Sequence, residues 1–320
     1  MATIIDKNAP LKDVIVKAVR EVLCGNLGRR DLPLLALTDQ AADELFCSPQ
    51  VNEVKAEIVG AGRRLWQREY VDGNGGNISA RISDELVLCT PTLCSKGQLR
   101  EQDLSIVDLD NRQIFGVRQQ TSEILLHLEI YKAVPRARAV IHCHPPYATA
   151  HAVAGVIPEG KLIPEQEVFV GPVALAPYET PGTKQFAETI LPFVRNHNTI
   201  LLANHGIVCW ADSVTHAGWF VEVVENYCKT IMIASQLRSP LPQIPPGKIQ
   251  ELLEIKKRLG LPDARLPDVD QEMDPSPLQT RHSESPTCSS GGSQQWLESN
   301  LESLAAALTA RILQDLGVRE

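Results

Sequence analysis

Aromatic residues, excess positive charge and long apolar runs are all scarce in this sequence. Its 320 residues are 5% aromatic, 43% hydrophobic and 22% charged, a composition that excludes a fibrous or wholly disordered chain. The formal net charge of -8 repels a nucleic-acid backbone, so we expect no nucleic-acid partner. The first residues lack a signal-peptide pattern, and no stretch is apolar enough to cross a bilayer. We therefore expect no membrane association and a cytoplasmic location.

Closely spaced cysteine pairs are also missing. The eight cysteines are scattered along the chain without a CxxC motif, which is typical of reduced thiols rather than of a disulfide framework. We expect them to be small buried apolar residues.

Helical periodicity is clearest near the start of the chain. Apolar residues between 10 and 24 form one stripe of an amphipathic helix, within a predicted N-terminal helical extension over residues 1–50. A second helical stretch over 53–70 leads into the glycine-rich turn 72–77.

Short apolar runs alternate with turns from about residue 77 onward. Two helical patterns, over 122–134 and 219–237, lie among these strand-like runs, which indicates an α/β domain over residues 51–262. The runs are 85–89, 105–109, 139–143, 171–176 and 199–204.

The composition changes after about residue 262. Residues 263–293 are rich in serine, proline and glycine, and they predict a disordered linker because so few apolar side chains cannot offset the entropy of ordering. Residues 294–320 predict one amphipathic helix with an unbroken apolar face. Such a face needs a partner surface.

The motif His142-x-His144 ends the apolar run 139–143. Side chains two residues apart on a strand lie on the same face, so both imidazoles can reach one cation. His205, in an Asn-His-Gly sequence at the end of the run 199–204, offers a third ligand. Three histidines leave one coordination position open, as catalytic zinc sites do.

Glu123 opens the helical stretch 122–134. From the local pattern alone, Thr121 or Ser122 caps this helix and Glu123 interacts with its positive N-terminal end. A carboxylate beside a metal can also remove a proton from a bound substrate. The local sequence favours capping and leaves the catalytic alternative open.

Six ordered motifs give the chain a family resemblance. They are GGNISAR (75–81), TPT (90–92), TSE with a histidine four residues on (121–127), HCHPPYAT (142–149), APYETPGT (176–183) and NHG (204–206). Over about residues 51–262 the sequence resembles the class II aldolase/adducin family, and within it the fuculose-phosphate aldolases. The resemblance implies a three-layer fold with a central, mainly antiparallel sheet flanked by helices, and a fourfold homotetramer.

The resemblance also implies roles for individual residues. His142, His144 and His205 would bind Zn²⁺, although imidazole ligands also accept other divalent metals. Glu123 would be the general base. The substrate phosphate would lie among Asn77, Thr92, Leu93, Thr121 and Ser122. The implied reaction cleaves a ketose 1-phosphate, of the fuculose or rhamnulose type, to dihydroxyacetone phosphate and an aldehyde such as lactaldehyde.

Some positions depart from the family pattern. A glycine of the fuculose-phosphate aldolases is replaced here by Leu93, and their two tyrosines from a neighbouring subunit fall near Ile163 and Leu259. Glu167 matches an acidic residue of related ribulose-phosphate 4-epimerases; the alternative is a solvated charge. Lys96 could reach a phosphate, or it could be an ordinary exposed lysine.

Other functions stay open at this point. The same scaffold supports a pentulose-phosphate 4-epimerase, a methylthioribulose-phosphate dehydratase or a non-catalytic, adducin-like interaction module. The linker followed by a short helix resembles an encapsulation peptide, which would place the enzyme in a bacterial microcompartment through shell proteins. The alternative is that residues 294–320 bind the enzyme's own tetramer.

Overall fold

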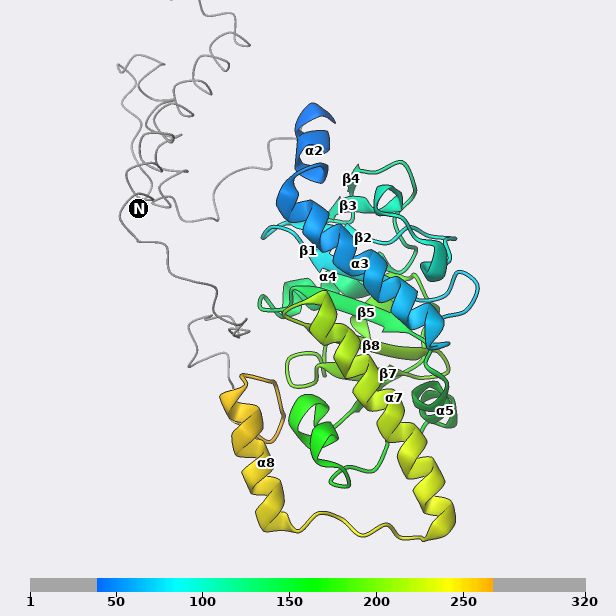
Figure 1. Cartoon of the computed structure of the whole chain (residues 1–320), viewed down its shortest axis with the longest axis vertical. Helices are drawn as coiled ribbons and strands as arrows, with labels where there is room; N and C mark the ends of the chain where they lie inside the picture. Colours follow the sequence, from blue (N-terminus) through cyan, green and yellow to red (C-terminus); the bar gives the residue numbers. More distant parts are fainter. Residues whose placement is uncertain (1–38, 267–320) are drawn as a thin grey trace, which may run out of the picture. The chain divides into compact units, whose positions relative to one another are not determined.

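One mixed sheet organises residues 39–266, the part of the chain that the computed structural model describes (Figure 1). Its eight strands run in the order β4-β3-β2-β1-β5-β8-β7-β6, and every neighbouring pair is antiparallel except β6 and β7. The predicted, mainly antiparallel sheet is confirmed. The strands are β1 (Asn77–Arg81), β2 (Leu86–Cys89), β3 (Ser105–Asp108), β4 (Gln113–Phe115), β5 (Ala139–Cys143), β6 (Ala174–Ala176), β7 (Thr199–Leu202) and β8 (Gly206–Ala211).

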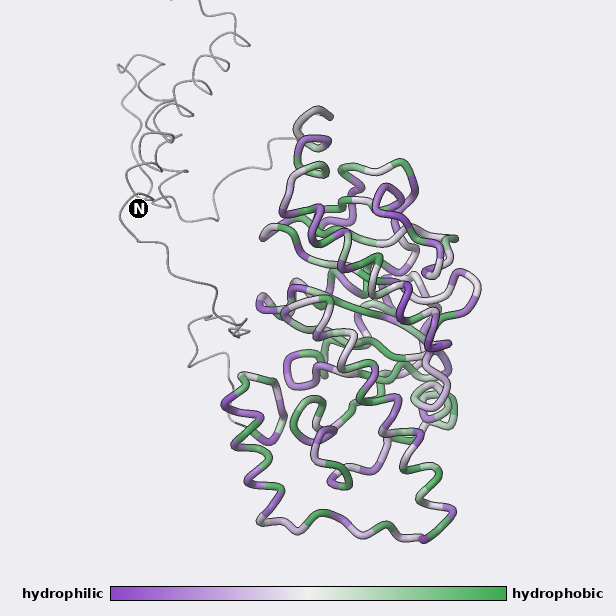
Figure 2. Tube along the Cα trace, viewed as in Figure 1, coloured by the Kyte–Doolittle hydropathy of each residue, from purple (hydrophilic) through white to green (hydrophobic). Residues whose placement is uncertain are grey.

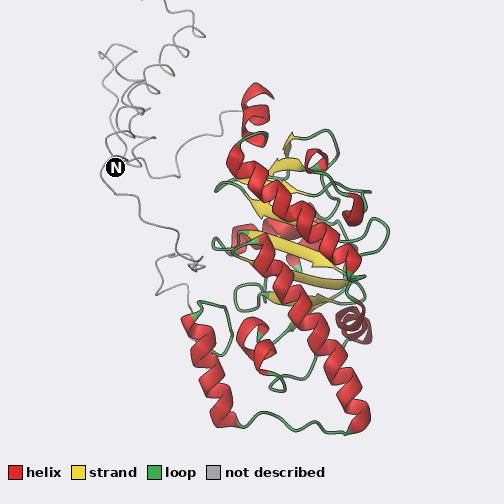
Figure 3. Ribbon diagram, viewed as in Figure 1, coloured by secondary structure: helices red, strands yellow, loops and turns green. Residues whose placement is uncertain are grey.

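Helices cover both faces of the sheet, which completes the predicted three layers (Figure 3). Helices α3 and α7 pack on one face, and α4 and α6 pack on the other. None of the described helices could span a membrane. The helices are α2 (Asp39–Phe46), α3 (Pro49–Gln67), α4 (Ile124–Ala133), α5 (Pro146–Ala154), α6 (Lys184–Glu188), α7 (Val214–Leu237) and α8 (Pro246–Arg258), with short helical turns η1 (Lys96–Gln98), η2 (Glu101–Asp103) and η3 (Gln166–Val170).

Strand alternation divides the core into two apolar layers. In β5, Ile141 and Cys143 pack in the layer beneath α3 and α7, whereas Val140 packs in the layer beneath α4. Figure 2 shows the hydrophobic residues gathered along the central strands. Because side chains alternate between faces, His142 must lie on the α4 side.

Two helices begin earlier than their apolar patterns predict. Helix α3 starts at Pro49 because the Ser48 hydroxyl accepts a hydrogen bond from the N–H of Val51. Helix α7 starts at Val214, where the Ser213 hydroxyl accepts from the N–H of His216. Serine caps therefore determine where both helices begin, four residues before the predicted start of α3 and five before that of α7.

The described fold continues to Leu266, past the predicted domain boundary at residue 262. Asp263 is buried and bonds to Arg265, so the first residues of the predicted linker belong to the fold. The predicted helices at 10–24 and 294–320, and the linker beyond Leu266, lie outside the described residues. Of the cysteines in the described part, Cys47 is exposed and the others are buried.

Candidate metal and substrate site

Three histidines converge on one point at the end of strands β5 and β7. The candidate ligand atoms of His142, His144 and His205 all lie within 4.8 Å of one another. The Nε2 atoms of His142 and His144 are 3.1 Å apart. Sequence reasoning placed these three side chains together, and the structure brings them together.

Backbone geometry lets His205 approach the other two. His205 lies in the turn between β7 and β8, after Asn204 at a positive φ of 55°. A Cβ atom on Gly206 would stand 2.6 Å from the Cys143 carbonyl oxygen and 2.6 Å from Cδ2 of His144. Only glycine therefore permits the close packing of this turn against the end of β5.

The protonation pattern of His142 leaves a lone pair facing the cluster. Its Nδ1 lies 2.8 Å from the carbonyl oxygen of Ile207, which can only accept, so Nδ1 carries the proton and Nε2 does not. Burial and the charges of His144 and His205 hold the pKa of His142 well below its ordinary value. The neutral Nε2 is thus ready to bind a cation.

The other two imidazoles are also held neutral. Burial, with His205 nearby, lowers the pKa of His144. Burial likewise lowers the pKa of His205, and the charge of Glu123 opposes that change. Neutral imidazoles are the form that binds divalent metals.

Glu123 directs its carboxylate at the same point. One oxygen lies 3.3 Å from Nε2 of His142 and the other lies 3.5 Å from Nε2 of His205. Because Nε2 of His142 and the carboxylate are both electron-pair donors, their approach calls for a cation between them. The residues present therefore fit a divalent metal.

The Glu123 side chain is directed away from the start of helix α4 and toward the histidines. Glu123 occupies the N-cap position of α4, but its carboxylate makes no cap hydrogen bond there. It accepts instead from Nδ2 of Asn77, at 2.7 Å. The Thr121 hydroxyl accepts from the N–H of Glu123, at 3.4 Å, and so serves the helix start.

The predicted phosphate residues lie on neighbouring segments. The N–H of Thr92 donates to the Gln119 carbonyl, and a single β-bridge joins Pro91 to Gln120. The segment before α4 is therefore held against the turn at 90–93. Asn77 and Thr121 are buried, Thr92 is half-buried, and Leu93 and Ser122 are exposed. Leu93 adopts a positive φ of 50°, in the region that favours the glycine it replaces.

Lys96 is buried, so the prediction of an exposed lysine is wrong. Its side chain is 2% exposed, and Nζ donates to the carbonyl oxygens of Cys94, at 2.7 Å, and Asn74, at 3.0 Å. Lys96 thus joins the glycine-rich turn before β1 to the turn at 90–94.

Glu167 is also buried, so it is not a solvated charge. It belongs to η3, where one carboxylate oxygen accepts from the N–H of Lys161 and the other lies 2.7 Å from Arg265. Arg265 also holds Asp263, which pairs with the buried Lys256 at 3.3 Å. This ion-pair group fastens the segment after α8 to η3.

Two polar residues behind the site, Ser79 and Tyr131, were not predicted from the sequence. Ser79 lies between His127 and Tyr131, bonded to both, on the buried α4 side of β1. Glu123, His127 and Tyr131 are spaced one helical turn apart on a single helix face. This spacing is the sequence pattern from which the role of Tyr131 could have been predicted.

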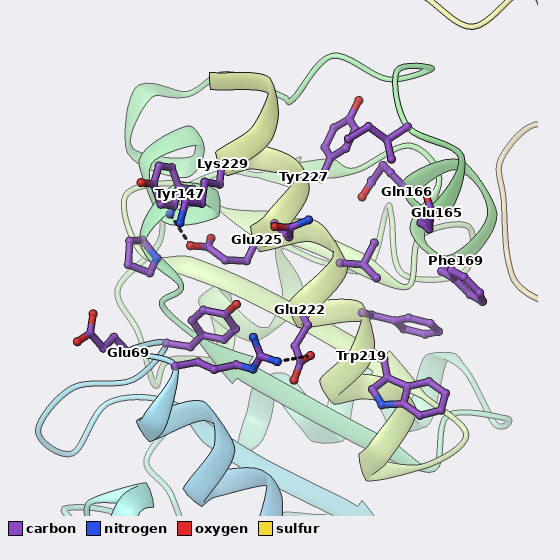
Figure 4. A pocket seen from close by; sticks show the side chains of 17 residues that line it. Glu69, Tyr147, Glu165, Gln166, Phe169, Trp219, Glu222, Glu225, Tyr227 and Lys229 are labelled. Carbon is purple, nitrogen blue, oxygen red and sulfur yellow. Dashed lines mark hydrogen bonds and ion pairs between the residues drawn. The ribbon is translucent and has the colours of Figure 1, made fainter. Parts of the chain in front are cut away.

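A cavity of about 830 Å³ lies beside α7 (Figure 4). Neither the three histidines nor Glu123 lines it. Its walls include Glu225, which accepts hydrogen bonds from the N–H groups of Tyr147 and Ala148, and Glu222, which pairs with Arg68. Both carboxylates are thus occupied by structural contacts.

Comparison with known proteins places this site in a family context. Residues 56–232 match the family described as class II aldolase and adducin N-terminal domain. The chain is similar to an L-fuculose phosphate aldolase of Methanococcus vannielii, with 38% identity over 168 residues that cover 52% of this chain and 88% of the relative. It is also similar to a 3-oxo-tetronate 4-phosphate decarboxylase of Escherichia coli, with 32% identity over 203 residues that cover 62% of this chain and 94% of the relative.

A solved structure gives the same result for the fold. An L-fuculose 1-phosphate aldolase superposes with a TM-score of 0.58 at 28% identity, over 63% of this chain and 98% of that chain. Because the family match spans more than half of the 320 residues, the chain belongs to the class II aldolase and adducin family and is a metal-dependent, aldolase-type enzyme.

Proposed function

We propose that this enzyme cleaves a carbon–carbon bond of a phosphorylated ketose, releasing dihydroxyacetone phosphate and an aldehyde. A ketose 1-phosphate of the fuculose or rhamnulose type is the proposed substrate. The observation that carries the proposal is the convergence of three imidazoles and one carboxylate at a single point. The relationship to L-fuculose phosphate aldolases supports the substrate class.

His142, His144 and His205 would hold the metal, and zinc is the ion that this donor set suits best. When bound, such a metal acts as a Lewis acid that stabilises negative charge developing on the substrate's carbonyl and hydroxyl oxygens. The hydrogen bond from His142 to Ile207 would orient that ligand and keep its lone pair available.

Glu123 would carry the proton. As the bond breaks, the hydroxyl group that becomes the aldehyde loses its proton and the three-carbon fragment is left as an enediolate. The nucleophilic carbon of that enediolate must then gain one proton to become dihydroxyacetone phosphate. A carboxylate at the edge of the histidine cluster is placed for that transfer. Its hydrogen bond from Asn77 would hold the carboxylate in place between turnovers.

The phosphate would bind among Asn77, Thr92, Leu93, Thr121 and Ser122. The start of α4 offers backbone N–H groups that attract an anion, and the neighbouring threonine and serine hydroxyls can donate further hydrogen bonds. The buried ammonium group of Lys96 would add positive charge behind these turns. Glu167 is proposed to act only structurally, because Arg265 and Lys161 occupy its carboxylate.

Decarboxylation of a phosphorylated 3-oxo acid is the second candidate. The similarity to 3-oxo-tetronate 4-phosphate decarboxylases supports it. This reaction also leaves an enediolate whose carbon must gain a proton, but carbon dioxide departs without the loss of a hydroxyl proton that formation of an aldehyde requires. This candidate accounts for Ile163 and Leu259 standing where the fuculose-phosphate aldolases have tyrosines.

One assay separates these reactions. The purified full chain, loaded with zinc, is incubated with fuculose 1-phosphate, rhamnulose 1-phosphate and 3-oxo-tetronate 4-phosphate, and dihydroxyacetone phosphate and carbon dioxide are measured in parallel. Dihydroxyacetone phosphate from a ketose phosphate supports the first proposal, and carbon dioxide supports the second. An epimerised or dehydrated product rejects both. No turnover, together with no bound metal, would favour the adducin-like module.

Two further proposals concern assembly. A homotetramer, as the family resemblance implies, is tested by measuring the mass of the full chain in solution. The shell address at 294–320 lies outside the described residues and stays a prediction. Co-purification with shell proteins should be lost when residues 294–320 are deleted, and its persistence would reject the address.

A further inference from the structure

We propose that His127 is a positioning residue that fixes the side-chain amide of Asn77 and, through it, the carboxylate of Glu123. The inference deepens the proposed function and rests on it for the role of Glu123. The contacts themselves form one continuous chain of hydrogen bonds from the interior of the α4 layer to the candidate metal site. Its members are Tyr131, Ser79, His127, Asn77 and Glu123.

Only one assignment of donors and acceptors allows every hydrogen bond in this series to form. An ionised Glu123 can only accept, so Asn77 must turn Nδ2 toward it, as the 2.7 Å contact shows. The carbonyl Oδ1 of Asn77 then faces Nε2 of His127 at 2.5 Å and can only accept. Nε2 of His127 must therefore carry the proton.

The direction continues inward. With Nε2 protonated, the neutral ring has Nδ1 as its acceptor, and the Ser79 hydroxyl lies 2.7 Å away as its donor. The Ser79 oxygen then accepts from the Tyr131 hydroxyl, at 2.8 Å. Burial lowers the pKa of His127 to about 3, in agreement with a neutral ring.

Secondary structure holds both ends of the chain rigid. Asn77 and Ser79 lie two residues apart on β1 and so share its α4 face, while His127 and Tyr131 lie one turn apart on α4. Asn77 also pairs in register with His142 on β5. Ser79, His127 and Tyr131 are at most 1% exposed, so water does not compete for these hydrogen bonds.

The consequence is a defined orientation at the site. If the donor at His127 were lost, Oδ1 of Asn77 would lose its hydrogen bond and the amide would be held from one side only. The Asn77 amide, and the Glu123 carboxylate bonded to it, would then be less firmly oriented toward His142 and His205. Asn77 has a second N–H on Nδ2, which the same orientation leaves available to a substrate oxygen.

The proposal separates two His127 substitutions. His127→Gln keeps an N–H donor near the position of Nε2, whereas His127→Leu removes it. We expect His127→Leu to lower kcat/KM about 10- to 100-fold on whichever phosphorylated substrate is turned over, mainly through kcat, and His127→Gln to recover most of that loss. Thr199→Val is the control, because Thr199 is equally buried but donates its hydrogen bond to Asn198, which is not part of the hydrogen-bond series from Tyr131 to Glu123.

Two readouts do not depend on turnover. The ¹⁵N chemical shifts of the His127 ring in the unsubstituted, metal-free protein report its tautomer, and Co²⁺ titration followed by visible absorption reports the metal surroundings. The inference predicts a neutral Nε2–H ring and a Co²⁺ spectrum that changes in His127→Leu but not in Thr199→Val. A protonated Nδ1, or equal activity losses in His127→Leu and Thr199→Val, would overturn it. If no tested substrate is turned over while the tautomer and spectra agree, only the proposed function fails.

Discussion

Replacing Lys96 by methionine should lower the free energy of unfolding by about 2–4 kcal/mol at neutral pH. Nζ donates to the carbonyl oxygens of Cys94 and Asn74, and a hydrogen bond from a charged group contributes about 1.5–3 kcal/mol. Methionine removes both bonds but also the cost of burying an ammonium group, so the net loss is smaller than their sum. The two carbonyls that remain buried account for most of it.

The loss should also depend on pH. Burial lowers the pKa of Lys96 to about 8, below its ordinary value of 10.5. Between these two values the unfolded chain binds more protons at this site than the folded protein, so the lysine's contribution to stability rises with pH. The gap in stability between the unsubstituted protein and Lys96→Met should therefore widen from pH 8 to 10.5.

Urea unfolding at pH 7, 9 and 10.5, followed by circular dichroism, measures both effects. Lys184→Met is the matched control, because that lysine is exposed and pairs with Glu188 across 3.5 Å. Its change should stay below about 0.5 kcal/mol. The assigned contacts would be refuted if Lys96→Met changed the free energy of unfolding as little as the control does. They would also be refuted if the difference in stability between the unsubstituted protein and Lys96→Met became smaller as the pH rises. Loosening of the two turns should also raise KM for a phosphorylated substrate.

Three further substitutions test the site and its support. Glu123→Gln keeps the shape of the side chain but not its basicity, so kcat should fall about 10²- to 10⁴-fold while zinc content by mass spectrometry stays unchanged; equal loss of metal and activity would reject its role as base. Leu93→Gly should raise the melting temperature by a few degrees, because glycine avoids the cost of about 1 kcal/mol that leucine incurs in the left-handed backbone conformation. Asp263→Leu leaves the buried Lys256 unpaired, removes the hydrogen bonds from Arg265 and should destabilise by about 3–5 kcal/mol, whereas adding Lys256→Met should restore the part of the loss that comes from the unpaired lysine; a double variant as unstable as the single would contradict the pairing.

The metal cluster could be predicted from sequence because strand geometry determines much of it. Residues two apart on a strand share a face, so the separation of His142 and His144 sufficed to bring them together. The glycine after His205 indicated a tight turn at the end of a neighbouring strand. Family resemblance then supplied the expectation that this turn meets the end of β5.

Burial of single charged residues could not be predicted in the same way. Lys96 and Glu167 have local sequences that suit exposed turns, but each is enclosed by partners from other segments. The partner of Glu167 is Arg265, which is 98 residues further along the chain. No local pattern encodes such a contact, because it exists only once α8 packs against η3.

The side-chain direction of Glu123 was the other open point. A carboxylate at a helix start is usually a cap or a dipole partner, and the local sequence favoured that interpretation. The outcome depended on Asn77, which is 46 residues away in sequence and draws the carboxylate toward the histidines. Tertiary contacts therefore decided between two interpretations that the local pattern allowed.

We propose that His142, His144 and His205 bind one metal ion on which turnover depends. The most direct test is to strip the purified full chain with a chelator, titrate zinc back, and measure bound metal and activity together, with His205→Ala beside the unsubstituted protein. We expect one zinc per chain, activity that returns in proportion to bound zinc, and little of either in His205→Ala. Full activity in the stripped protein, or unchanged zinc binding in His205→Ala, would contradict it.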